Sequence, residues 1–256
     1  MEHWHNKYYD IAAESDVGER SENQDAYGIN ISEHDAAIVV CDGMGGFEGG
    51  KAAGQLAVSE MLRLCRHIED GEQNYGNALT YAMDVADVKI SNLQSSQGRK
   101  MHAGATCVTV LLKKRGMYCL SVGDSRLYIY RKGRMAQLTR DHTVALKAEN
   151  DYRNGNMTYD EYVNAAKDKS TLCSYLGLGG IEIYDVNNEI YKLQKEDILI
   201  ISSDGLYKSL DINAMKKIIE KYSDAETIAH KLINSAADYA RGHNQDNTTV
   251  AVCRIK

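Results

Sequence analysis

Aspartates beside glycine or asparagine recur in this sequence where apolar runs begin or end. Four such pairs are Asp42-Gly43, Gly123-Asp124, Asp204-Gly205 and Asp246-Asn247, and a further aspartate, Asp25, ends a polar stretch. Each one alone is typical of a turn or a helix cap. Together they predict carboxylates gathered at one end of a sheet, where they would raise one another's pKa unless cations neutralised them. Carboxylate oxygens are the ligands that Mg²⁺ and Mn²⁺ prefer.

Of these aspartates, Asp42 is the one preceded by the most apolar run of residues. Residues 36–41 predict a buried strand, and three of the next four residues after Asp42 are glycines, which permit a sharp turn. Such a turn would leave a carboxylate and its neighbouring carbonyls at the open end of the strand. Two divalent cations about 3.5–4 Å apart that share carboxylates are a known arrangement for phosphoryl chemistry. The alternative is a strand-to-helix turn with a structural aspartate, and this motif alone favours the alternative.

The composition is that of a globular protein, with 256 residues of which 43% are hydrophobic and 26% charged. A net charge of −6 argues against nucleic acid as a partner. The six cysteines form no Cys-x-x-Cys pair, so we expect small buried residues in a reducing compartment, not disulfides or a zinc site. No signal core begins the sequence, and no run approaches the roughly 18 apolar residues of a membrane span. We therefore expect a cytoplasmic protein without a membrane partner.

Hydrophobic periodicity predicts the elements that would position the aspartates. Apolar residues recur at steps of three and four over residues 51–69 and 75–93, which predicts two helices. Apolar runs predict strands at residues 8–13, 36–41, 105–112, 117–122, 126–131, 135–138, 197–202 and 248–255. Because short turns join the four strands between 105 and 138, we expect one antiparallel meander there. Two late helices, capped by Asp211 and Asp224, are expected to run to about residues 221 and 240.

Residues 143–174 break this regular pattern. Tyrosine, asparagine and charged residues dominate there, and a local helix is predicted over residues 159–167. A segment this long inside a compact domain is typical of a lid or a binding segment, and a surface loop without a function is the open alternative. Because the sequence shows no repeat, linker or low-complexity run, we expect one domain over residues 1–256 with a variable flap at about 143–174.

Seven short motifs occur in an order that is more specific than any one of them. They are residues 18–25 (GERSENQD), 40–46 (VCDGMGG), 104–106 (GAT), 122–126 (VGDSR), 138–142 (LTRDH), 203–206 (SDGL) and 245–250 (QDNTTV). In this order they resemble the metal-dependent protein phosphatase family (protein phosphatase type 2C), in its bacterial form. The resemblance covers nearly the whole chain. It implies an α+β fold in which two antiparallel β-sheets pack as a sandwich flanked by helix pairs, in four αββα layers.

The resemblance implies that Mn²⁺ or Mg²⁺ is the cofactor, with two ions per site. Asp42 would bridge the two ions, and Gly43 would lend its carbonyl oxygen to one of them. Asp204 and Asp246 would bind the second ion. A water or hydroxide bridging the two metals would attack phosphorus in line, because it loses a proton more easily between two cations.

The remaining motif residues have implied roles as well. Asp124 would hold a third, weaker metal together with Asp204, and Asp25 would act on the metals directly or through water. Arg20 would bind the substrate phosphate, because its planar guanidinium suits phosphate oxygens and stays charged at any working pH. Arg20 and Asp42 are thus the expected catalytic residues. The alternative for Arg20 is a solvated loop arginine.

Two positions depart from the family pattern. Met44 stands where eukaryotic members often carry a histidine proposed as the general acid, and methionine cannot donate a proton. A metal-bound water is the first candidate for that role and His142 the second, although structural hydrogen bonding is the commoner fate of such a histidine. Residues 165–177 lack the His-Pro pair of many bacterial members, so the substrate preferences of the family's flap do not transfer.

The resemblance implies a serine/threonine protein phosphatase, a hydrolase of phosphoserine and phosphothreonine that acts in bacterial signalling. Its implied partners are phosphorylated proteins, among them a cognate Ser/Thr kinase and its substrates, and we expect a monomer. Two alternatives stay open: a catalytically silent regulator that binds phosphoproteins, and a hydrolase of small phosphate esters. The presence of Arg20, Asp42, Asp204 and Asp246 argues against the silent regulator.

Overall fold

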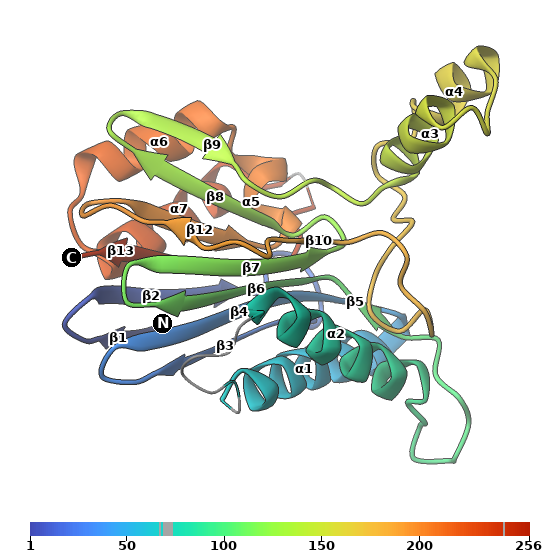
Figure 1. Ribbon diagram of the computed structural model, residues 1–256, viewed down its shortest axis with the longest axis horizontal. Helices are drawn as coiled ribbons and strands as arrows, with labels where there is room; N and C mark the ends of the chain where they lie inside the picture. Colours follow the sequence, from blue (N-terminus) through green and yellow to red (C-terminus); the bar gives the residue numbers. More distant parts are fainter. Residues whose placement is uncertain (67, 69–73, 243) are drawn as a thin grey trace.

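Two antiparallel sheets pack face to face in the computed structural model, which describes residues 1–66, 68, 74–242 and 244–256 (Figure 1). The first sheet has the order β1 (Glu2–His5), β2 (Tyr9–Asp16), β13 (Thr248–Ile255), β12 (Ile198–Ser202), β8 (Arg126–Arg131), β9 (Arg134–Gln137). The second has the order β10 (Asp185–Val186), β7 (Gly116–Val122), β6 (Cys107–Lys113), β4 (Asp35–Met44), β3 (Asp25–Ile31). The short strands β5 (Gly104–Ala105) and β11 (Tyr191–Lys192) pair with β4 and β7.

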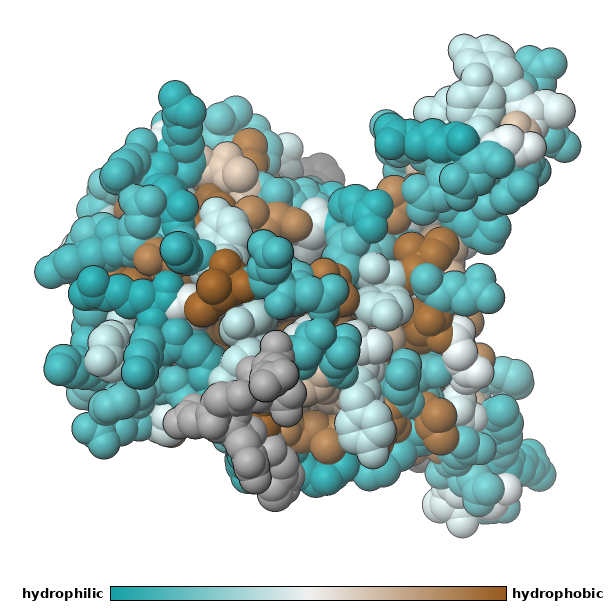
Figure 2. All heavy atoms as spheres, viewed as in Figure 1, coloured by the Kyte–Doolittle hydropathy of each residue, from teal (hydrophilic) through white to brown (hydrophobic). Residues whose placement is uncertain are grey.

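Helices cover the outer face of each sheet. The second sheet carries α1 (Gly46–Cys65) and α2 (Tyr75–Ser91), and the first carries α5 (Asp204–Ser209), α6 (Ile212–Lys221) and α7 (Ala225–Ala240) (Figure 1). The remaining two helices, α3 (Val144–Arg153) and α4 (Tyr159–Ala165), project from the body of the molecule as a hairpin. The surface of this hairpin is mostly hydrophilic in the view of Figure 2.

Three apolar cores hold these layers together. Strand β4 is apolar over residues 36–41 because both of its faces are buried. Ala37, Val39 and Cys41 face α1 and α2, whereas Ile38 and Val40 face the other sheet. A strand alternates its side chains between two faces, so a strand buried on both faces has no polar alternation. A third core lies between the first sheet and helices α5, α6 and α7. The expected four-layer α+β sandwich is therefore confirmed.

The glycines after Asp42 allow α1 to pack directly on the end of β4. A Cβ atom at Gly43 would lie 2.0 Å from the carbonyl oxygen of Gly50, so a larger residue would push the helix away. The strand continues to Met44 and does not end at the aspartate. The expected end of this strand at residue 41 is thus wrong by three residues, and Asp42 is held within a sheet ladder.

The expected meander over residues 105–138 is wrong at its centre. Strands β6 and β7 form the predicted hairpin, and β8 and β9 form another, but β8 pairs with β12 in the opposite sheet. The chain crosses between sheets at residues 123–125. Gly123 has φ +95°, a backbone conformation that favours glycine, and lies against Thr106. This crossover brings Asp124 to the end of the sandwich where the other aspartates lie.

We predict that Gly123→Ala lowers the free energy of unfolding by about 3 kcal/mol, because it adds left-handed backbone strain to a clash. Its Cβ would lie 2.6 Å from Cγ2 of Thr106. Gly133→Ala is the matched control, because Gly133 also has a positive φ, +77°, but nothing within 4 Å of an added Cβ. It should cost only about 1 kcal/mol. Urea unfolding of both variants checks the difference; equal losses would contradict it.

Most of the other predicted elements are confirmed. The second early helix and both late helices occur where expected, and Asp211 and Asp224 cap the late ones by accepting from backbone N–H groups. Helix α1 begins five residues before the expected start at 51, and its expected end at residue 69 lies outside the described residues. The predicted local helix is α4, and α3 beside it was not predicted.

The cysteines are free thiols, and four of the six are buried. They therefore act as the small apolar residues that the sequence predicts. Among the described residues, no helix combines the length and the apolar character needed to cross a membrane.

Candidate metal centre

Five aspartates from distant segments meet at one end of the sandwich. Asp25 and Asp42 are directly opposite each other on β3 and β4. Asp124 lies on the crossover between β7 and β8, Asp204 is the first residue of α5, and Asp246 precedes β13. The charges of the other four each raise the pKa of Asp42, so these four carboxylates lie within electrostatic reach of it. We call this group the acidic cluster.

Asp25 and Asp42 are held by residues of both sheets. Oδ2 of Asp25 accepts a hydrogen bond from Oγ of Ser203 at 2.6 Å, while its buried Oδ1 has no hydrogen-bond partner among the described residues. Burial, followed by the charges of Asp204 and Asp246, raises the pKa of Asp25 to about 7. Burial, followed by the charge of Asp25, also raises the pKa of Asp42 well above its usual range.

Thr106 fixes the backbone of Asp42 from the neighbouring strand. The N–H of Asp42 donates to Oγ1 of Thr106 at 2.9 Å, and the carbonyl oxygen of Asp42 accepts from the N–H of Thr106 at 2.8 Å. Gly43 is tied to the preceding loop, since its N–H donates to the carbonyl oxygen of Gln24 at 3.2 Å. All three hydrogen bonds are made by backbone atoms of Asp42 and Gly43, so none of them occupies the carboxylate of Asp42.

Asp124 and Asp204 complete the far side of the acidic cluster. The hydroxyl of Tyr207 donates to Oδ2 of Asp124 at 3.1 Å. Burial, followed by the charge of Asp204, raises the pKa of Asp124 to about 6. Asp204 is only 8% exposed, and its buried Oδ1 has no hydrogen-bond partner in the described part of the chain. Burial raises the pKa of Asp204 even though the nearby Lys208 opposes the shift.

Two cationic side chains in the described part of the chain contact the acidic cluster. Nε of Arg20 lies 3.0 Å from Oδ1 of Asp246. The ammonium of Lys208 forms an ion pair with Oδ2 of Asp204 and lies 3.6 Å from Oδ2 of Asp246. Five carboxylates thus face two cationic side chains, so the charge of the cluster is only partly neutralised.

The donor set fits hard divalent cations. It consists of carboxylate oxygens, with neither cysteine nor histidine among the five, and buried oxygens of Asp25 and Asp204 lack hydrogen-bond partners. Mg²⁺ and Mn²⁺ bind such oxygens, and their charge would offset the repulsion within the cluster. Over the ranges that the structure describes, no three acidic, histidine or cysteine side chains already surround one point as metal ligands. The ligand roles of the individual residues therefore stay predictions.

His142 has a structural role. It is fully buried, its Nδ1 accepts from the N–H of Gly123 at 3.1 Å, and its Nε2 lies 3.6 Å from Oδ2 of Asp185. Asp185 in turn is bound by Arg140. Burial alone would raise the pKa of Asp185, but its contacts with His142 and Arg140 lower it below its usual range. His142 thus braces the crossover that carries Asp124, as the structural alternative for it predicted.

The sequence analysis missed four residues that hold the acidic cluster: Thr106, Ser203, Tyr207 and Lys208. Thr106 and Ser203 lie inside motifs that were recognised, so their place beside the aspartates was a usable signal. Tyr207 and Lys208 follow the SDGL motif on α5. Because residues four apart lie on one face of a helix, the spacing of Lys208 from Asp204 could have indicated their ion pair.

Two cavities flank Arg20. One, of about 300 Å³, is lined by residues that include Arg20, Asp42, Gly43 and Asp246. The other, of about 640 Å³, is lined by Arg20, Lys208, Asp246 and the exposed Tyr239, among others. Arg20 therefore stands between the acidic cluster and open space from which a substrate could approach.

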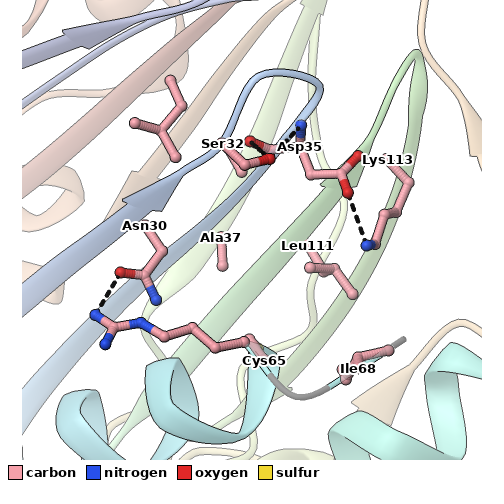
Figure 3. Close-up of a pocket in the computed structure, with 11 residues that line it drawn as sticks. Asn30, Ser32, Asp35, Ala37, Cys65, Ile68, Leu111 and Lys113 are labelled. Carbon is pink, nitrogen blue, oxygen red and sulfur yellow. Dashed lines mark hydrogen bonds and ion pairs between the residues drawn. The ribbon is translucent and has the colours of Figure 1, made fainter. Parts of the chain in front are cut away.

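A further cavity of about 460 Å³ lies away from this site (Figure 3). Its lining includes Asn30 and Asp35, at the ends of β3 and β4 opposite to Asp25 and Asp42. Lys113 forms an ion pair with Asp35 there, and Asn30 accepts from Arg66. None of the predicted site residues lines this cavity.

Comparison with known proteins places these features in a family. The model described as "Protein phosphatase 2C" matches residues 12–151, more than half of the chain. A curated relative, "Serine/threonine phosphatase stp" of Listeria welshimeri, is 26% identical over 235 residues, which cover 90% of this chain and 89% of the relative.

Solved structures of similar proteins share the fold. A serine/threonine phosphatase of S. agalactiae has a TM-score of 0.79 at 24% identity, covering 97% of this chain and 100% of that one. The catalytic domain of the serine/threonine protein phosphatase PstP, determined in complex with two manganese ions, has a TM-score of 0.74 at 24% identity, covering 97% and 98%. These likenesses confirm the expected sandwich architecture.

Proposed function

The chain belongs to the protein phosphatase 2C family, and from this premise we propose how its acidic cluster removes phosphate from phosphoserine and phosphothreonine in proteins. It is a metal-dependent serine/threonine protein phosphatase, a hydrolase that uses Mn²⁺ or Mg²⁺, as the family match and its named relatives support. The observation that carries the proposal is the meeting of five aspartates in one group, in which a buried oxygen of Asp25 and one of Asp204 have no hydrogen-bond partner among the described residues: Asp25, Asp42, Asp124, Asp204 and Asp246.

The aspartates would divide the metal-binding task. Asp42 would hold both ions, and the carbonyl of Gly43 would bind one of them. Asp204 and Asp246 would bind the second ion, and Asp124 with Asp204 would bind a weaker third. Asp25 would act on the ions directly or through water. When bound, the ions would neutralise the carboxylates, polarise the phosphate ester and lower the pKa of water. Ser203 and Tyr207 hold the carboxylates of Asp25 and Asp124 in place, and Thr106 fixes the backbone of Asp42.

Arg20 would orient the phosphate. Its side chain is about half exposed, at 48%, and lies between Asp246 and two cavities. A guanidinium forms paired, charge-assisted hydrogen bonds with phosphate oxygens, and bonds of this kind contribute about 1.5–3 kcal/mol. Met44 cannot donate a proton, and His142 is fully buried with its Nδ1 bound to the N–H of Gly123, which favours a structural role for His142 over general acid catalysis.

We predict that Arg20→Ala lowers kcat/KM for a phosphothreonine peptide by about 10- to 100-fold, mainly through KM, because the phosphate loses its paired donors. The kcat/KM of Arg20→Lys should lie between those of Arg20→Ala and wild type, because lysine keeps the charge but not the planar group with its paired donors. Steady-state kinetics with saturating Mn²⁺ measures both. A loss confined to kcat would contradict a role in substrate binding.

The proposed function is tested by dephosphorylation of a phosphothreonine peptide with Mn²⁺, with Mg²⁺ and with chelator. Metal-dependent release that chelator abolishes supports the phosphatase. A parallel assay with a small phosphate ester separates the open alternative, since a small-ester hydrolase would prefer the ester to the peptide. A folded protein that binds the phosphopeptide but releases no phosphate with either metal would be a silent regulator.

The same proposal includes the partners of the enzyme and its location in the cell. Phosphoproteins are the substrates, and we propose a cognate Ser/Thr kinase and its substrates as partners, with the enzyme acting as a monomer in the cytoplasm. The net charge of −6 supports partners other than nucleic acid. Residues 1–256 would form one phosphatase domain, with residues 143–174, which contain α3 and α4, as its variable flap.

A further inference from the structure

Lys208 contacts two of the proposed metal ligands at once. It lies one turn after Asp204 on α5, and its ammonium forms an ion pair with Asp204 and approaches Asp246 at 3.6 Å. The two contacts join residues that are distant in sequence, from the start of α5 and from the loop before β13. Lys208 therefore links two carboxylates that a single divalent cation would also link.

The second cation, Arg20, makes a different set of contacts. Among the aspartates of the cluster, Arg20 forms an ion pair with Asp246 alone. Arg20 also lines the two cavities described above. Lys208 faces the larger cavity with about half of its side chain exposed, at 54%. An ammonium on a flexible stem can thus leave the carboxylates for this cavity without any change in the backbone.

We propose that Lys208 is a resident counter-cation that competes with the divalent cation for Asp204 and Asp246. Two positive charges cannot share these carboxylates without repulsion, and a metal ion must displace the ammonium or bind against it. Lys208 thus sets the metal concentration at which the site fills, and it stabilises the carboxylates of the metal-free protein. This inference rests on the proposed function, because it takes Asp204 and Asp246 as metal ligands.

Calorimetric titration of the full chain with MnCl₂ tests the competition directly. Lys208→Met removes the charge and keeps most of the length of the side chain, and we expect it to bind Mn²⁺ about tenfold more tightly than wild type. Lys208→Arg keeps the charge and should stay within about threefold of wild type. Lys216→Met is the matched control, because Lys216 also pairs with an acidic residue four positions away, Glu220 at 3.5 Å, but on α6.

Thermal melting gives a second, independent readout. In chelator at pH 7.5, Lys208→Met should melt below wild type, because Asp204 and Asp246 lose their counter-charge. In saturating Mn²⁺ this difference should shrink or reverse, because the tighter metal binding stabilises the variant more. Lys216→Met should show no such change between the two conditions.

The possible outcomes separate the inference from its premise. Equal or weaker Mn²⁺ binding by Lys208→Met, while wild type binds Mn²⁺, would overturn the competition and leave the metal centre in place. A folded wild-type protein that binds no Mn²⁺ would overturn the metal centre and the inference together. If Lys208→Met fails to fold even in Mn²⁺, Lys208→Gln replaces it in the same titration with the same expected gain.

Discussion

An Asp42→Asn variant is expected to lose on the order of 10³-fold in kcat towards a phosphothreonine peptide while it keeps its fold. Asparagine has nearly the shape of aspartate but offers one neutral carbonyl oxygen to a cation. The two hydrogen bonds with Thr106 should survive, because they involve the backbone N–H and carbonyl of Asp42. The loss should therefore come from metal binding and catalysis, not from unfolding.

The same substitution should not destabilise the metal-free protein. Burial and the charge of Asp25 raise the pKa of Asp42, so a neutral residue at this position removes a repulsion. We expect Asp42→Asn to melt at or above the wild-type temperature in chelator. Asp238→Asn, at an exposed position of α7 paired with Arg241, is the matched control and should keep full activity. More than about a tenth of wild-type activity in Asp42→Asn would rule out its bridging role.

The metal-free protein is expected to lose stability as the pH rises from about 4 to about 7. The pKa of Asp25 is raised from 3.8 to about 7 and that of Asp124 to about 6 in the folded state. A carboxyl group with a raised folded-state pKa holds its proton more tightly in the folded protein than in the unfolded chain. Its stabilising effect is thus complete at low pH and is lost as the pH passes the folded-state pKa.

The expected size of this effect is on the order of 2–4 kcal/mol, or about 5–10 °C in Tm for a domain of this length. Saturating Mn²⁺ should abolish it, because bound cations keep the carboxylates ionised and stable near neutral pH. Thermal melts at several pH values in chelator and in Mn²⁺ measure both curves. A melting temperature in chelator that is flat or rises between pH 5 and 7.5 would contradict the buried, mutually repelling cluster.

The acidic cluster could be predicted from the sequence only as a set of positions. The pairs of aspartate with glycine or asparagine marked Asp42, Asp124, Asp204 and Asp246, and the order of the motifs indicated the family. The residues that fix the carboxylates depend on contacts between remote segments, such as the bond between Ser203 and Asp25. Local patterns carry no information about such pairs, so these supports had to come from the structure.

The fold, like the acidic cluster, could be predicted where the signal lies in neighbouring residues and not where it depends on distant segments. The late helices were predicted closely because each has its own cap and its own periodicity, whereas β3 was missed because none of its residues is fully buried and its pattern is weak. The error at residues 123–125 arose because a short connection usually joins neighbouring strands. The chain crosses there because β8 pairs with β12 in the opposite sheet, and no local pattern in the sequence indicates this pairing.

The central place of β13 in the first sheet makes the completion of that sheet depend on residues 248–255. Strand β13 lies between β2 and β12, so the first sheet has a gap in its middle until residues 248–255 have left the ribosome. Pairings between segments so far apart in sequence slow folding, and translation adds only about 5–20 residues per second. Of the five aspartates in the acidic cluster, Asp25 and Asp42 are made first and Asp246 is made after the other four. A nascent chain therefore lacks the complete acidic cluster until residues 246–255 have been made, and we expect it to have no phosphatase activity before that point.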